Sequence, residues 1–273
     1  MYFLYPEGKK QALTFSFDDN QEYDKKLVEI FNKYGMKGTF NINSSTLDGT
    51  ADQNWDGNVY IKKSEVNEVY KGHEVACHGL NHKFIAGLPD SMIITEFMED
   101  RKNLEAITGK IINGAAYAFG WHDEKIMNML KTMGFKYSRG VDDTNFFFPP
   151  QNFLDWKPTV HQESERLFEL GDTFLNVPGF IELPIMYVWG HSFEFGRSGD
   201  WSRIEEFCKK MSGKESIWYA TNMEICDYIT ATRSLEFSAD GTKVFNPTII
   251  TVWLDDYGKT VELKPGETIT VKI

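Results

Sequence analysis

The chain contains 273 residues, of which 41% are hydrophobic and 15% are aromatic. This length suits one large α/β domain, or one domain with a small appendage, and the aromatic content supplies ample core. The formal net charge is -11 and the pI is near 5.1. We do not expect an acidic chain without a run of Lys and Arg to bind nucleic acid or another acidic polymer.

The start of the chain does not resemble a signal peptide, because the apolar run Met1–Tyr5 meets Pro6 and Glu7 too early. No later run reaches the length of a membrane span. We therefore expect a soluble protein, cytoplasmic as the chain stands, or secreted or periplasmic if a leader has been removed. An odd number of cysteines without CxxC spacing predicts buried thiols rather than disulfides or a cysteine zinc site. These are Cys77, Cys208 and Cys226.

The segment Leu13–Asn20 is typical of a strand that runs directly into two carboxylates, Asp18 and Asp19. In an α/β barrel, side chains at the C-terminal ends of strands form the active site. Successive strand residues point in opposite directions, so the two carboxylates are expected to have different tasks, one binding a metal and the other facing substrate. The alternative is an ordinary turn that caps the following helix.

Strand and helix patterns alternate along most of the chain, which predicts parallel strands joined by right-handed crossovers in a closed or nearly closed barrel. The predicted strands span residues 13–18, 37–42, 74–77, 115–118, 135–141, 183–189 and 216–220. The predicted helices span residues 22–34, 64–70, 90–108, 124–133, 201–211 and 223–231. Residues 43–60 are expected to form a long polar loop, and residues 142–165 an irregular one.

The pattern changes after Arg233, where short strand-like runs are separated by turn residues. We expect a barrel domain over residues 1–232 and a small antiparallel extension over residues 233–273. About 40 residues make a poor independent core. The extension is therefore expected to pack on the barrel, and a carbohydrate-binding module is the alternative.

A pair of histidines, His78 and His82, follows the predicted strand at residues 74–77. Two imidazoles four residues apart on one face of a helical turn reach a single ion at about 2.0–2.1 Å. With a carboxylate from the first strand they make a three-ligand site with open positions, as in catalytic metal centres. A metal-bound water attacking a carbonyl is the implied chemistry. Surface or packing histidines are the alternative.

These residues resemble the polysaccharide deacetylases of carbohydrate esterase family 4, which share the NodB homology domain. The family motif Thr-Phe-Asp-Asp-Gly is similar to Ser16–Asn20, and its motif His-Ser/Thr-x-x-His is similar to His78–His82. The last family motif, Leu-x-His, has a counterpart in Trp189–His191. The resemblance covers roughly residues 10–232. It implies a distorted, incomplete (β/α) barrel of the NodB type with the small C-terminal β appendage.

The resemblance also implies roles for individual residues. Asp18 corresponds to the general base, Asp19 to the metal-binding carboxylate, and His191 to the general acid, while His78 and His82 supply the remaining metal ligands. The implied ion is zinc, with cobalt or nickel compatible with the same ligands. The implied reaction removes an acetyl group from an N-acetylated sugar in a polysaccharide or oligosaccharide.

Two family motifs are eroded. The third, Arg-Pro-Pro-Tyr-Gly, corresponds to Ala115–Gly120 without its arginine, and the fourth, Asp-x-x-Asp-Trp, is reduced to Asp142–Phe146. We expect Arg139 to replace the missing arginine and keep the base ionised. A structural ion pair is the alternative for Arg139. Asp142 is expected to orient the general acid.

Aromatic side chains in the predicted loops could contact the apolar faces of sugar rings. The candidates are Tyr117, Phe119, Trp121 and Trp189. Two other functions remain open from the sequence. One is hydrolysis of an amide in a small cyclic imide or ureide, and the other is a carbohydrate-binding pseudoenzyme, which the two eroded motifs would permit.

Overall fold

The structure is a computed structural model that describes residues 1–47 and 58–272, so much of the loop predicted at 43–60 lies outside the described residues. A parallel eight-stranded sheet forms its centre, with the order β6-β5-β4-β3-β2-β8-β7 and β9 paired to the start of β2. The strands are β2 (Gln11–Asp18), β3 (Gly38–Ile42), β4 (Glu74–Cys77), β5 (Gly114–Ala116), β6 (Tyr137–Arg139), β7 (Val160–His161), β8 (Ile185–His191) and β9 (Ile217–Tyr219).

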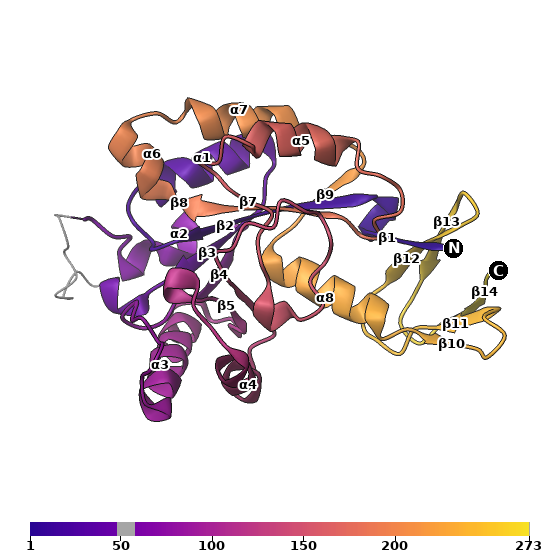
Figure 1. Cartoon of the computed structure of the whole chain (residues 1–273), viewed down its shortest axis with the longest axis horizontal. Coiled ribbons are helices and arrows are strands. Elements are labelled where there is room, and N and C mark those ends of the chain that lie inside the picture. Colours follow the sequence, from indigo (N-terminus) through magenta and orange to yellow (C-terminus); the bar gives the residue numbers. More distant parts are fainter. Residues whose placement is uncertain (48–57, 273) are drawn as a thin grey trace.

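Helices cover the outer faces of this curled sheet (Figure 1). They are α1 (Asp24–Tyr34), α2 (Val66–Val69), α3 (Asp90–Thr108), α4 (Glu124–Thr132), α5 (Leu167–Leu175), α6 (Ser192–Ser198), α7 (Ser202–Met211) and α8 (Asn222–Arg233). The sequence did not predict α5 or α6. The buried residues of α5 do recur at helical spacing, at Leu167, Leu170, Gly171 and Phe174, so its pattern could have predicted a helix. The helix α6 is short and begins directly at the end of β8, so it has too few residues to show a repeat.

Strand β2 shows how the sequence separates core from site. Its alternate residues Phe15 and Phe17 lie on the outer face, where Phe15 packs on Phe31 of α1 with ring centroids 4.6 Å apart. Burying each such ring contributes about 1.5–3 kcal/mol. The residues between them, Ser16 and Asp18, are buried on the other face, inside the curled sheet. A polar interior therefore lies within an apolar outer shell.

The sheet is an incomplete barrel. Between β6 and β7 contact is limited to the segment before β7, where Trp156 forms an isolated parallel bridge with Arg139. The Trp156 ring is 2% exposed and packs edge-on against Tyr187 of β8. One bulky side chain thus fills the gap that a full strand pair would close. This is the distorted barrel expected from the resemblance.

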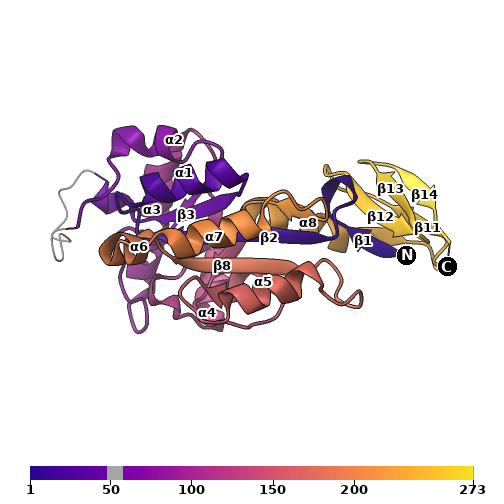
Figure 2. The ribbon, with the colours of Figure 1, turned by 90° about the horizontal axis from the view of Figure 1, so that it is seen from above.

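The appendage contains two three-stranded antiparallel sheets and lies at one end of the barrel (Figures 1 and 2). One sheet has the order β1-β12-β13, with β1 (Tyr2–Leu4), β12 (Val252–Asp256) and β13 (Lys259–Leu263). The other has the order β10-β11-β14, with β10 (Glu236–Phe237), β11 (Lys243–Phe245) and β14 (Thr268–Thr270). The sequence did not reveal that the first three-residue strand of the chain joins this appendage.

Side chains from both ends of the chain form the core between the appendage and α8. Val252 and Leu254 are fully buried there together with Ala231 of α8. The hydroxyl of Tyr228 donates to the carbonyl of Leu4 and accepts from the backbone N–H of Trp253 at 3.0 Å. These contacts attach the appendage to the barrel through one helix.

Candidate active site

Strand β2 ends at Asp18, and the next residue leaves extended geometry. Asp19 has a φ of 76°, which is the left-handed region. The two carboxylates consequently approach the same imidazole, with His78 Nε2 at 3.6 Å from both Asp18 Oδ2 and Asp19 Oδ1. The expectation of opposite directions is wrong here, because alternation holds only while the backbone remains extended.

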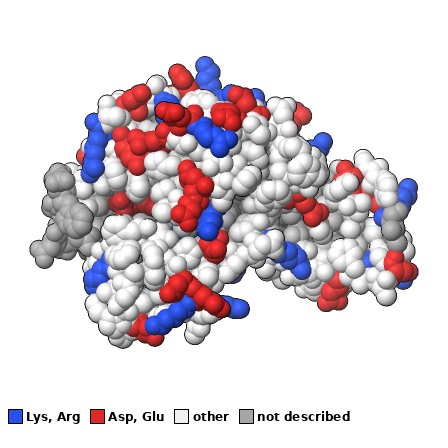
Figure 3. All heavy atoms as spheres, viewed as in Figure 1, with Lys and Arg blue, Asp and Glu red and all other residues white. Residues whose placement is uncertain are grey.

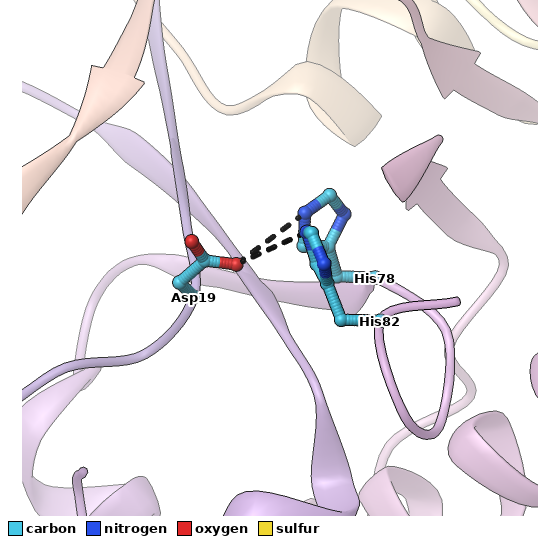
Figure 4. A group of neighbouring side chains, drawn as sticks. All are labelled: Asp19, His78 and His82. Carbon is cyan, nitrogen blue, oxygen red and sulfur yellow. Dashed lines mark ion pairs between the residues drawn. The ribbon is translucent and has the colours of Figure 1, made fainter. Parts of the chain in front are cut away.

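Asp19, His78 and His82 converge as the three-ligand hypothesis requires. Asp19 Oδ1 lies 3.6 Å from His78 Nε2 and 3.5 Å from His82 Nε2, and both rings turn toward that oxygen (Figure 4). Two ligand atoms at about 2.0–2.1 Å from one ion and separated by a tetrahedral angle lie roughly 3.3–3.5 Å apart. The donor set therefore fits a zinc-sized divalent ion.

The hydrogen bond on the far side of His78 supports the same reading. His78 Nδ1 lies 3.0 Å from the carbonyl oxygen of Ala116. A carbonyl can only accept, so Nδ1 carries the proton and Nε2 presents its lone pair. Burial and the neighbouring His78 lower the pKa of His82, which favours a neutral imidazole there as well.

The two histidines are joined by a tight turn rather than by the predicted helical turn. His82 has a φ of 52°, and two buried acids of α3 hold the turn in place. Asp100 accepts a hydrogen bond from the backbone N–H of His78 at 3.1 Å, and Glu96 accepts one from that of Asn81 at 2.8 Å. These acids are four residues apart, so they face the turn from one side of the helix. The sequence-based reasoning missed both.

Arg139 lies against Asp18 inside the barrel. Its side chain is fully buried, and Nη2 donates to both carboxylate oxygens. Burial by itself raises the pKa of Asp18, but the charge of the Arg139 guanidinium and its hydrogen bonds to the carboxylate bring that pKa well below its ordinary value. In the sheet register Arg139 is opposite Ala116, within the segment where the family motif carries its arginine. A guanidinium from the neighbouring strand occupies this position next to the base.

His191 ends β8 directly beside the end of β2, because the register pairs its Cα with that of Asp18. Its Nε2 is 4.0 Å from Asp19 Oδ2, and its Nδ1 is 3.0 Å from Glu194 Oε1. Burial lowers the pKa of His191, but the Glu194 hydrogen bond and the charges of Asp18 and Asp19 together raise it to about 9. These neighbours therefore favour the protonated form of the imidazole.

Glu194, in the first turn of α6, is a functional residue that sequence reasoning missed. Besides His191 it contacts His161 Nε2 at 3.4 Å and accepts a hydrogen bond from Gln162 Nε2 at 2.5 Å. His161, His191 and Glu194 offer ligand atoms within 4.8 Å of one another. Because the Glu194 oxygens already accept from these neighbours, the cluster serves to hold His191. The signal in the sequence was a glutamate three residues after a strand-terminal histidine, which is capping-box spacing.

Asp142 does not orient His191, contrary to expectation. Its side chain is 78% exposed and lies 4.0 Å from Lys157 Nζ. The chain leaves the barrel after β6, so Asp142 points into solvent on the outside of the molecule. Glu194 takes the position next to the imidazole instead.

The aromatic candidates have different environments. Tyr117 is fully buried, stacks on His122 at 4.3 Å and donates its hydroxyl to Leu154 O at 2.9 Å, so it has no surface for a substrate. Trp189 lies under the Arg139 guanidinium at 4.7 Å, and its Nε1 donates to Asp143. Its ring therefore packs against Arg139 and helps to hold that guanidinium in place. Phe119 and Trp121 remain exposed.

We call Asp19, His78 and His82 the triad. A pocket of about 310 Å³ opens next to it, with Asp19 and His82 in its lining. Its lining combines Asp19 and His82 with amides, aromatic rings and one guanidinium, contributed by Asn43, Asn81, Tyr60, Phe119, Phe193 and Arg197. A volume near 300 Å³ with few polar groups among rings suits a small organic group. The pocket size is therefore compatible with one acetylated sugar.

The surface gives no sign of a basic band on the face shown in Figure 3, where Lys and Arg are scattered among Asp and Glu. Among the described residues, no helix is both long enough and apolar enough to cross a bilayer.

Comparison with known proteins finds one family model and several solved structures that are similar to this chain. Residues 5–138 match the family model described as polysaccharide deacetylase. A search of curated proteins finds no match. The match covers β2 to β6, including the carboxylate pair, both histidines of the triad and the strand that leads to Arg139.

Several solved structures share the fold at low sequence identity. A protein assigned as a polysaccharide deacetylase of Mycobacterium smegmatis aligns at a TM-score of 0.63 and 18% identity, over 85% of this chain and 95% of that one. The Puue allantoinase aligns at 0.63 and 12%, over 84% and 93%. A CE4 family pseudoenzyme from Bacillus anthracis aligns at 0.51 and 16%, over 83% and 68%. At such identities these likenesses establish the fold alone.

Proposed function

We propose that this chain is a metal-dependent hydrolase that removes acetyl groups from N-acetylated sugars of polysaccharides or oligosaccharides, because residues 5–138 match the family model described as polysaccharide deacetylase. The observation that carries the proposal is the convergence of Asp19, His78 and His82 beside a buried carboxylate and a protonated imidazole. This combination would supply a metal site, a base and an acid next to one pocket.

The triad would hold one divalent ion, with zinc the first choice and cobalt or nickel compatible with the same ligands. Bound there, the ion would act as a Lewis acid toward the acetyl carbonyl and make a water a stronger nucleophile. The chain itself supplies the proton transfers.

Asp18 accepts the proton of the attacking water as its oxygen bonds to the acetyl carbon. Arg139 keeps Asp18 ionised and fixes the orientation of its carboxylate. His191 gives its proton to the sugar nitrogen as the carbon–nitrogen bond breaks, which releases acetate and the free amine. Glu194 fixes the His191 ring, so that Nε2 faces the pocket.

The test is acetate release from N-acetylglucosamine oligomers. We expect turnover that a chelator abolishes and that added zinc or cobalt restores. Asp18→Asn and His191→Ala should each lower turnover by about 10²-fold or more while metal binding persists, since each removes a proton-transfer group rather than a ligand. Asp142→Asn is the matched control, because that carboxylate is exposed and outside the pocket. Full activity in Asp18→Asn would contradict the proposal.

A second function has its own support. The barrel aligns with the Puue allantoinase as well as it does with the Mycobacterium smegmatis protein, and both TM-scores are 0.63. Asp18, His191 and the triad could equally hydrolyse an amide in a cyclic imide or ureide. A substrate panel with acetylated glycans, cyclic imides and ureides distinguishes the two. Metal-dependent product from the cyclic amides alone would replace deacetylation with this activity.

A binding-only role is the third alternative. The Bacillus anthracis protein of this fold is described as a pseudoenzyme. In the present chain Asp18 is retained and ion-paired next to a complete triad, although a protein without turnover has no need of a base there. Saturable glycan binding with no product from the whole panel would establish the binding role.

A further inference from the structure

A guanidinium lines the pocket next to the triad. Arg197, in the last turn of α6, lies in the same lining as Asp19 and His82. Among the described residues of this lining, Asp19 carries the one acidic side chain, and its carboxylate is directed at the two histidines of the triad. Arg197 is therefore a charge in the pocket that the proposed metal site does not use.

Arg197 differs from the other arginines of the chain in what it contacts. Those arginines use their guanidinium groups on carboxylates or on backbone carbonyls; they are Arg101, Arg139, Arg166, Arg203 and Arg233. Within residues 1–47 and 58–272, the hydrogen-bond acceptor of Arg197 is a neutral amide, since Nη2 donates to Asn58 Oδ1 at 3.0 Å. A guanidinium carries five N–H donors, so this single contact leaves capacity for a ligand.

An aromatic ring of the same helix holds the guanidinium in place. Phe193 and Arg197 are four residues apart, so they share one face of α6, and Arg197 Cζ lies 4.3 Å from the centre of the Phe193 ring. The same ring stacks on His191 with centroids 4.8 Å apart. Phe193 therefore fixes Arg197 on the side of the pocket next to the proposed general acid. A group that is held before binding loses little conformational freedom when a ligand arrives.

The chemistry of this group selects an anion. A planar guanidinium matches a carboxylate or a phosphate, to which it donates two parallel N–H···O bonds. A neutral sugar offers hydroxyl and amide groups, for which the amides of Asn43 and Asn81 in the same lining provide neutral partners. A cation beside the general acid, paired with no carboxylate among the described residues, is accounted for by a negative charge on the ligand.

We propose that Arg197 determines specificity by binding an anionic group of the substrate, so that the acetylated sugar carries a carboxylate or a phosphate. This inference rests on the deacetylase function proposed above. His191 gives its proton to the sugar nitrogen, and Phe193 contacts both His191 and Arg197. The anionic group is therefore expected on a carbon next to the one that bears the acetylated nitrogen.

The experiment compares kcat/KM of the zinc-loaded enzyme for two pairs of matched substrates. One pair is the 3-O-carboxymethyl ether of N-acetylglucosamine and the methyl ester of that ether. The other is N-acetylglucosamine 1-phosphate and the neutral methyl glycoside. The wild type should prefer the charged member of a pair by about tenfold, the size of one hydrogen bond between charged groups. Higher ionic strength should weaken this preference.

Three variants show whether Arg197 is the cause. Arg197→Met should bring the preference to about one, because Met can still pack on Phe193 but carries no charge. Arg197→Lys should keep part of the preference, since it retains the charge and loses the planar fork. Arg166→Met is the matched control, because Arg166 is exposed, pairs with Glu169 and lies outside the pocket lining.

Each outcome decides one question. A preference that falls in Arg197→Met but not in Arg166→Met supports the anion site, and the pair that shows it identifies the carboxylate or the phosphate. Equal kcat/KM within both pairs, or a preference that Arg197→Met leaves unchanged, overturns the anion site while deacetylation stands. If no substrate turns over, deacetylation fails instead, and calorimetric titration with the same pairs decides the anion site. Tighter binding of a charged member by the wild type than by Arg197→Met supports it, and equal binding overturns it.

Discussion

Two buried polar networks lie inside the barrel, one at each end of the strands. The site network contains Ser16, Asp18, Asn41, His78 and Arg139, and the far network contains Thr14, Thr39, Glu74, Tyr137 and Asn222. A pocket lies beside each, about 310 Å³ at the site and about 530 Å³ at the far end. Pocket volume therefore does not identify the functional end.

The difference lies in how the polar groups are used. In the far network Glu74 accepts from Thr39, from Tyr137 and from the N–H of Met223 in the first turn of α8, at 2.7–2.9 Å. A carboxylate at a helix N-terminus with three donors is a complete arrangement. Every buried polar side-chain atom of the far network has a hydrogen-bond partner. In the site network the buried Asn41 Oδ1 has no hydrogen-bond partner.

The site network also continues into partly exposed titratable side chains at the edge of the pocket. Asp19, His82 and His191 carry side chains that are 21–26% exposed. The Asp19 carboxylate and the Nε2 atoms of His78 and His82 lie close together there at 3.5–3.6 Å, at the edge of hydrogen-bonding distance. Networks that satisfy themselves stabilise a fold, and networks that leave donor atoms directed at a pocket are available for ligands.

The largest expected effect is the loss of a triad ligand. Asp19→Ala and His82→Ala should weaken zinc binding by more than the roughly 10–100-fold that removal of a supporting group costs. Competition with a chromophoric chelator measures this at neutral pH. Thr39→Val in the far network should leave the affinity unchanged. Undiminished zinc uptake in Asp19→Ala would separate the triad from metal binding.

Arg139→Met tests the pair at the centre of the site network. The base works only when ionised, and Arg139 lowers the pKa of Asp18, so without the guanidinium that pKa rises. The acidic limb of the pH profile of kcat/KM should therefore move to higher pH. Removing one partner of a buried pair also costs stability, about 3–5 kcal/mol.

Arg139→Lys provides the control for that stability loss, because it keeps the charge and loses only the planar fork. It should shift the acidic limb less than Arg139→Met does. If the profile of a folded Arg139 variant drops in height without moving, the guanidinium has a structural role only.

Glu194→Gln should have a smaller effect, at the opposite limb. The general acid works only when protonated, and the Glu194 hydrogen bond helps to raise the pKa of His191 to about 9. The neutral amide removes that contribution, so the basic limb of the kcat/KM profile should move to lower pH. NMR titration of the His191 ring measures the same shift directly. An unmoved basic limb would assign the limb to another group.

Thr39→Val should have the smallest effect on activity. It leaves the N–H of Asn222 without its acceptor and removes one donor to Glu74, which costs about 1–3 kcal/mol of stability. Urea unfolding measures this loss, while kcat/KM should stay within twofold of the wild-type value. A larger kinetic loss with unchanged stability would mean that the far network takes part in turnover.

Local signals were sufficient for the elements that are bounded by clear stop residues. The helix predicted at 90–108 and the strand predicted at 74–77 agree with α3 and β4 at both ends. Each is bounded by a clear stop, Gly109 in the left-handed region for α3 and Gly72 shortly before β4. By contrast β1, β7 and α6 were missed because they are short. The helix α5 was missed although its buried residues have helical spacing.

The site divides in the same way. Asp18, Asp19, His78 and His82 stand in two compact motifs next to strands, so their chemistry can be read from neighbours in the sequence. Asp142 was chosen by its order in the chain and proved to be exposed. Glu194 was overlooked because a glutamate at the start of a helix is common, and its contact with His161 is identified only in space.

The sequence by itself indicated the type of fold, the candidate metal ligands and the candidate base Asp18, because strand patterns and ligand spacing are local properties. The tertiary structure alone decided which arginine meets Asp18, which acid holds His191 and which aromatic rings face solvent. Each of these depends on strand register and on contacts between distant segments. Arg139 reaches Asp18 across 121 positions of the chain because the parallel sheet curls until β6 faces β2.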